Sequence, residues 1–67
     1  MTGVIKKLAS DRGFGFLADE TDGKEYFFHR SGLDNGVDFD SLRVGTNVEF
    51  EVQPSDRGPR ATHVRVV

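Results

Sequence analysis

An all-β fold is predicted by two features of this 67-residue sequence. Eight glycines separate short runs rich in valine, phenylalanine and leucine, and such runs between turn residues are typical of β-strands. Residues 47–52 alternate strictly between polar and apolar side chains, as expected of a strand with one buried face and one wet face. The length suits one domain with a thin core, which we expect to span residues 1–67.

Five strands are expected, each an apolar run bounded by glycine or polar turn residues: 4–8, 14–18, 25–29, 47–52 and 61–67. Short turns at 11–13 and 21–23 separate the first three strands, which should therefore form an antiparallel meander. Residues 30–45 are polar and contain glycine, so we expect a long connection with a short helical turn near 31–33. A loop at 55–59 precedes the last strand.

Three strands, a long connection and two more strands predict a five-stranded antiparallel Greek-key β-barrel, the OB-fold. Closure of the barrel removes the open sheet edges that would expose so small a domain to aggregation. An open SH3-like barrel is the alternative fold.

The second and third strands carry a row of aromatic side chains. Because side chains alternate across a strand, Phe14 shares a face with Phe16, and Phe27 shares a face with His29. Pairing the two strands as a hairpin places all four on one surface. Enough apolar residues remain to fill a small core: Ile5, Leu17, Phe28, Val48, Phe50, Val52 and Val64. We therefore expect the row to face solvent, where an aromatic patch marks a binding site; the alternative is that the row is the core.

Gly15 stands between the two phenylalanines of the second strand. Glycine packs nothing and weakens a strand, so its presence there predicts a tight bend or a close approach of another part of the chain.

The charges are unevenly distributed although the net charge is only −2. Residues 1–17 carry a net charge of +2, residues 18–56 carry −7 and residues 57–67 carry +3. If the two ends meet in the fold, a basic strip forms beside the aromatic row. Aromatic side chains with cationic edges are what a binding site for single-stranded nucleic acid requires.

Two motifs resemble those of the cold-shock domain family. Residues 11–17, Asp-Arg-Gly-Phe-Gly-Phe-Leu, resemble its first ribonucleoprotein motif, and residues 26–29, Tyr-Phe-Phe-His, resemble its second. Residues 35–42 resemble its aromatic-bearing loop, and residues 57–64 its closing strand. The resemblance covers nearly the whole chain. It implies a five-stranded barrel that binds single-stranded RNA and DNA with low sequence preference, as an RNA chaperone or a regulator of transcription or translation.

The resemblance also implies which residues bind. The residues expected to stack on bases are Phe14, Phe16, Phe27, His29 and Phe39. Those expected to meet phosphates or bases are Lys6, Arg12 and Arg57.

Three departures from the family pattern alter the expected binding. Lys7 and Leu8 stand where bacterial members usually have Trp-Phe. Arg30 stands where they usually have an aromatic residue, and Asp40 stands where they often have a basic residue. We include Lys7 and Arg30 in the binding set, because both supply charge and a guanidinium plane can also stack. We expect weaker and more salt-dependent binding than is typical of the family.

Other classes of function find little support. The absence of cysteine excludes a thiolate zinc site, and His29 and His63 lie far apart in the sequence. No nucleophile–base set is recognisable, and Gly13-x-Gly15 lacks the strand–helix context of a dinucleotide site. We expect no catalytic residues, metal, cofactor or small-molecule substrate.

Location and partners follow from the same sequence. No apolar run is long enough for a signal peptide or a membrane span, so we expect a cytoplasmic monomer that does not bind membranes. The alternative functions are a protein-interaction module, whose acidic surface suits a basic peptide, and a ribosome-associated translation-factor barrel.

Overall fold

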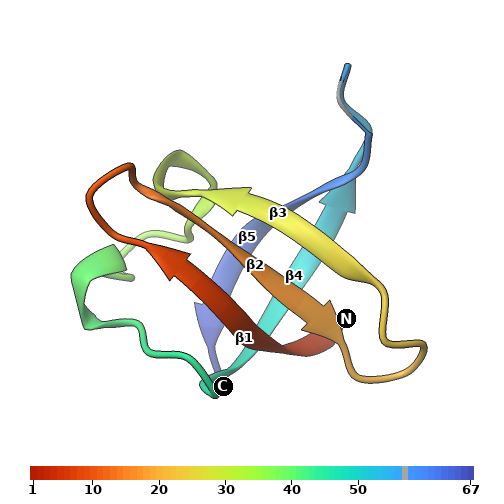
Figure 1. The fold of residues 1–67 in the computed structure, drawn as a ribbon, viewed down its shortest axis with the longest axis horizontal. Coiled ribbons are helices and arrows are strands. Elements are labelled where there is room, and N and C mark those ends of the chain that lie inside the picture. The colour runs from red at the N-terminus through yellow and green to blue at the C-terminus, as the bar shows by residue number, and fades with distance from the viewer. Residues whose placement is uncertain (57) are drawn as a thin grey trace.

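Five strands in the order β1-β2-β3-β5-β4 close into a barrel in the computed structural model, which describes residues 1–56 and 58–67 (Figure 1). The strands are β1 Thr2–Ala9, β2 Phe14–Asp19, β3 Glu25–His29, β4 Asn47–Gln53 and β5 Arg60–Val66. The long connection between β3 and β4 contains two short 3₁₀ helices, η1 Arg30–Gly32 and η2 Phe39–Ser41. The predicted fold class is confirmed, and every predicted strand boundary lies within two residues of the observed one.

One strand pair departs from the predicted antiparallel arrangement. β3 and β5 run parallel, with Phe27 paired to Arg60, whereas the other neighbouring strands pair antiparallel. The helical turn expected near 31–33 is η1, and η2 was not predicted. In the described part of the chain, no helix is long and apolar enough to cross a membrane.

A β-bulge in β1 decides which of its side chains face the core. Ile5 and Leu8 are three positions apart, so strict alternation would place them on opposite faces. The pairing with β2 shifts between Ile5 and Lys7, which leaves Lys6 as the extra residue. Ile5 is therefore buried, Leu8 packs against the core, and Lys7 lies beside Phe16, its partner on β2.

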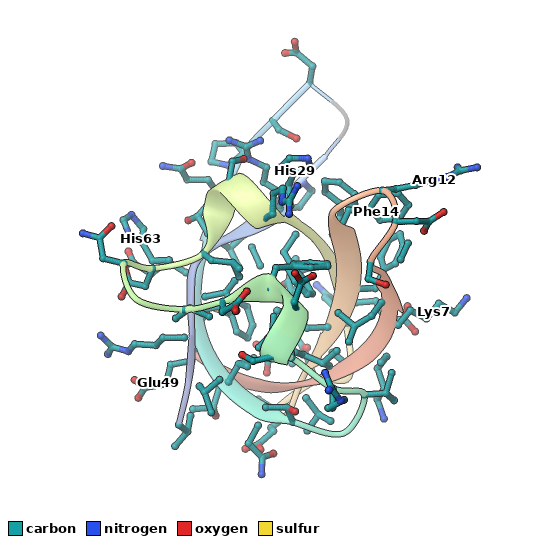
Figure 2. The ribbon with its side chains drawn as sticks, turned by 90° about the vertical axis from the view of Figure 1, so that its left-hand side faces the viewer. Lys7, Arg12, Phe14, His29, Glu49 and His63 are labelled. Carbon is teal, nitrogen blue, oxygen red and sulfur yellow. The ribbon has the colours of Figure 1, made fainter. Side chains whose placement is uncertain are left out.

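Among the described residues, nine form the core and come from the five strands and the β3–β4 connection: Ile5, Leu17, Phe28, Phe39, Leu42, Val48, Phe50, Ala61 and Val64. Six of the seven residues predicted to fill the core are buried, and Val52 is partly buried against it. The core residues that were not predicted are Ala61 of β5, Phe39 of η2 and Leu42, which follows η2. In Figure 2, η2 lies across the end of the barrel that faces the viewer.

Gly15 allows β1 and the core to approach β2 closely, as its position in the sequence predicts. A Cβ added there would lie 2.5 Å from the carbonyl oxygen of Lys7 and 2.9 Å from the Phe28 ring. We expect Gly15→Ala to lower the free energy of unfolding by about 1–3 kcal/mol, because the backbone of β1 must move. Urea unfolding followed by circular dichroism measures this loss, and Gly15→Val should lose more. If Gly15→Ala is as stable as the wild type, the close approach of β1 does not require glycine at this position.

Candidate nucleic-acid interface

The outer side of the β2–β3 hairpin carries an aromatic face formed by Phe14, Phe16, Phe27 and His29. Phe14 pairs with His29 and Phe16 pairs with Phe27 across the two strands. The centroid of the Phe27 ring lies 5.5 Å from that of Phe14 and 5.8 Å from that of Phe16, so the three rings form one continuous cluster. Aromatic pairs at such distances attract one another, which orders the rings before any ligand arrives.

The aromatic face is accessible to solvent. Phe27 is 36% exposed, whereas its neighbour Phe28 is 0% exposed and lies in the core. Phe14, Phe16 and His29 are half-buried, and the rings of Phe14 and Phe16 contact each other edge to face. The prediction that this row faces outward is therefore confirmed, and the alternative, in which the row fills the core, is wrong.

Lysine side chains of β1 border one side of the aromatic face. Lys7 is exposed and pairs with Phe16, and Lys6, the bulge residue, is also exposed. Both line a shallow hollow together with Phe14 and Phe16. In Figure 2, Lys7 lies on the same side of the barrel as Phe14. A single-stranded nucleic acid passing over the rings would bring its phosphates within reach of these ammonium groups.

Two arginines lie at the end of the hairpin that carries Phe14. Arg12 is exposed in the β1–β2 turn, near Phe14 in Figure 2. Arg30 lies against the same turn: its backbone N–H donates to the carbonyl oxygen of Gly13 at 2.8 Å, and a Cβ added at Gly13 would lie 2.9 Å from its Cδ. Gly13 has φ 73°, which favours glycine, and the missing side chain leaves room for Arg30. Arg30 is thus held beside the aromatic face with its charge exposed.

The β4–β5 loop borders the other side of the aromatic face. Phe27 and Arg60 line a hollow with loop residues Ser55, Asp56, Gly58 and Pro59. The Ser55 hydroxyl donates to the carbonyl oxygen of Gly58, which tightens the loop. Arg57, predicted to bind, lies outside the described residues. Sequence reasoning missed Arg60, because only the parallel pairing of β3 with β5 brings it next to Phe27.

Phe39, which the family resemblance predicts to stack on a base, lies in the core of this structure. Phe39 is 5% exposed, and its ring centroid lies 6.2 Å from that of Phe28 within the core. Asp38 caps η2 by accepting a hydrogen bond from the backbone N–H of Asp40, and this turn directs the Phe39 ring inward. Phe39 closes one end of the barrel instead of extending the aromatic face.

The basic strip expected from the two chain ends does not form as predicted. β1 and β5 are separated by β4 in the barrel, and Arg65 pairs with Glu49 at 2.7 Å and with Asp34 at 3.8 Å. The hydrogen bond and the charge of Glu49 raise the pKa of Arg65 above its usual value. In Figure 2, Glu49 lies on the opposite side of the barrel from Lys7. Cations of β1 and β5 therefore flank the aromatic face from two sides instead of forming one strip.

Comparison with known proteins agrees with this architecture. A family model described as the "'Cold-shock' DNA-binding domain" matches residues 1–67. The "Cold shock-like protein" of Thermotoga maritima is 39% identical over 67 residues, which cover 100% of this chain and 98% of that protein. The "Probable cold shock protein A" of Mycolicibacterium smegmatis is 38% identical, covering 97% of this chain and 96% of that protein. The "Cold shock-like protein CspB" of Yersinia pestis is also 38% identical, covering 96% of this chain and 90% of that protein. The relatives align with this chain along nearly their whole length, and the barrel topology and the aromatic hairpin agree with the match. This chain therefore belongs to the cold-shock domain family.

Proposed function

We propose that this protein binds single-stranded RNA and DNA by stacking successive bases on the aromatic face. The observation that carries the proposal is the contact among three solvent-accessible phenylalanine rings, with Phe27 exposed and Phe14 and Phe16 half-buried, between two cationic borders. Stacking on a ring is open to every base, so the proposed binding has low sequence preference. The cations proposed to hold phosphates are Lys6, Lys7, Arg12, Arg30 and Arg60; Arg57 is carried over from the family motif.

The accessible aromatic face also supports a role as an RNA chaperone. Rings can stack only on bases that are unpaired, so the protein binds the open form of a hairpin and not the closed form. A ligand that binds one of two forms shifts the equilibrium toward it, so the protein would melt weak secondary structure. Regulation of transcription or translation would follow from the same shift. We propose that it acts in this way in the cytoplasm, as a monomer without a cofactor.

A fluorescence titration of labelled heptathymidine at several salt concentrations tests the proposal. Binding should weaken steeply as salt rises, because five of the proposed phosphate contacts border the rings on exposed side chains in the described residues. Absence of binding at low salt would contradict the proposal. Binding that does not respond to salt would contradict the assigned role of the cations but not that of the rings.

Lys7→Gln should flatten this salt dependence. Each phosphate contact on a single strand contributes about 0.7 to the magnitude of the slope of log K against log salt, so the slope of the variant should be shallower by about that amount. Lys24→Gln is the matched control, because Lys24 is an exposed lysine in the β2–β3 turn, between acidic residues. Equal slopes for Lys7→Gln and wild type, or an equal loss in Lys24→Gln, would contradict the contact.

A further inference from the structure

His29 is the one member of the aromatic face that can form hydrogen bonds. It is the N-cap residue of η1, where its Nδ1 atom accepts a hydrogen bond from the backbone N–H of Ser31 at 3.1 Å. The hydroxyl oxygen of Ser31 lies 2.9 Å from the same nitrogen. Ser31 therefore contacts His29 Nδ1 through two separate groups.

These contacts decide which ring nitrogen carries the proton. A backbone N–H is always a donor, so the nitrogen that accepts from it must present a lone pair. Nδ1 of His29 is therefore unprotonated, and the Ser31 hydroxyl, which rotates freely, can donate to it as well. A neutral imidazole has one N–H, which must then lie on Nε2.

The Nε2 atom of His29 is accessible to solvent. Within residues 1–56 and 58–67, it has no hydrogen-bond partner, and no buried side-chain nitrogen or oxygen there lacks one. Nε2 is therefore not buried. Because His29 pairs with Phe14, this N–H lies at the edge of the phenylalanine cluster, whose rings carry no polar atom.

We propose that Ser31 is a positioning residue that holds His29 in the Nε2–H tautomer, and that this N–H donates to the carbonyl oxygen of a base on the aromatic face. The proposal rests on the proposed function and names the base chemistry of that site. Thymine, uracil and guanine carry carbonyl oxygens that project beyond the ring, whereas adenine carries none. At one position of a bound oligonucleotide, we therefore expect the protein to bind a carbonyl-bearing base more tightly than a base of the same shape without that acceptor.

The tautomer is measured without any ligand. A two-bond ¹H–¹⁵N correlation spectrum of the neutral side chain should show His29 protonated at Nε2 and not at Nδ1. Ser31→Ala, which removes the hydroxyl and keeps the N–H, should raise the share of the Nδ1–H form, and Ser31→Thr should restore the wild-type spectrum. A merely structural role of Ser31 would change stability and leave the tautomer unchanged. An Nδ1–H signal in the wild type overturns the proposal.

The donor is tested with a set of heptathymidines in which one thymine at a time is replaced by difluorotoluene nucleotide, which keeps the shape but lacks the strong acceptors. Wild-type protein should lose about three- to tenfold in affinity at one position, the effect of one hydrogen bond. His29→Phe, which keeps a ring without a donor, should bind all members of the set without that loss. The same loss in His29→Phe, or no such position in the wild type, overturns the proposal. If heptathymidine itself does not bind, the proposed function fails, and the tautomer spectrum still decides the role of Ser31.

Discussion

Replacing Phe14, Phe16 and Phe27 together with alanine abolishes measurable binding of heptathymidine while the barrel remains folded. Each base stacked on an aromatic side chain is worth about 1–3 kcal/mol by alanine substitution, so each single variant should bind about 5- to 150-fold more weakly. The three effects will not add simply, because the rings contact one another and each orders its neighbours.

Fluorescence anisotropy of the labelled oligonucleotide measures the affinity, and urea unfolding of the same samples reports stability. Val67→Ala is the control, because it removes an exposed apolar side chain that lies outside the aromatic face. The account is contradicted if the triple variant retains wild-type affinity, or if Val67→Ala loses as much affinity.

Phe28→Ala has the opposite signature, because it removes a side chain that is 0% exposed. Truncation of a buried phenylalanine costs about 3–5 kcal/mol. Domains are stable by only about 0.05–0.15 kcal/mol per residue, which is about 3–10 kcal/mol for this chain, so that loss should remove a large share of its free energy of unfolding. Far-UV circular dichroism in increasing urea measures the change, and Phe28→Leu should retain more stability.

Phe27→Ala provides the direct comparison. The two residues are adjacent in β3 and have the same side chain, but Phe27 is exposed and Phe28 is enclosed. We expect Phe27→Ala to lose mainly affinity and Phe28→Ala mainly stability. Equal losses of stability in the two variants would mean that the exposed and buried faces of β3 are wrongly assigned.

The strands and the direction of the aromatic face could be predicted from the sequence because both depend on local patterns. Alternation within β2 and β3 places Phe14, Phe16 and Phe27 together, and one short turn joins the two strands. The volume of the apolar side chains then indicated which face is buried, because Phe28 and Phe50 together with the aliphatic residues suffice to fill so small a barrel.

The features that the sequence could not predict depend on contacts between distant segments. Residues 30–45 have no periodicity that separates inward from outward side chains, so nothing in the sequence showed that Phe39 closes the core. Arg60 reaches the aromatic face only through the parallel pairing of β5 with β3. The β1 bulge places Lys7 beside Phe16, and a bulge cannot be located from the sequence pattern of one strand.

A chemical-shift titration of ¹⁵N-labelled protein with a short single-stranded oligonucleotide tests the central claim most directly. If bases stack on the aromatic face, the amide signals of Phe14, Phe16, Phe27 and His29 should move together and saturate at one equivalent of ligand. Glu49 and His63 lie on the opposite side of the barrel from Lys7 in Figure 2, and Asp34 contacts His63 there at 3.4 Å; we call this the acidic side. Signals of these three residues should stay in place. Movement of the acidic-side signals with none at the four aromatic-face residues would contradict the account.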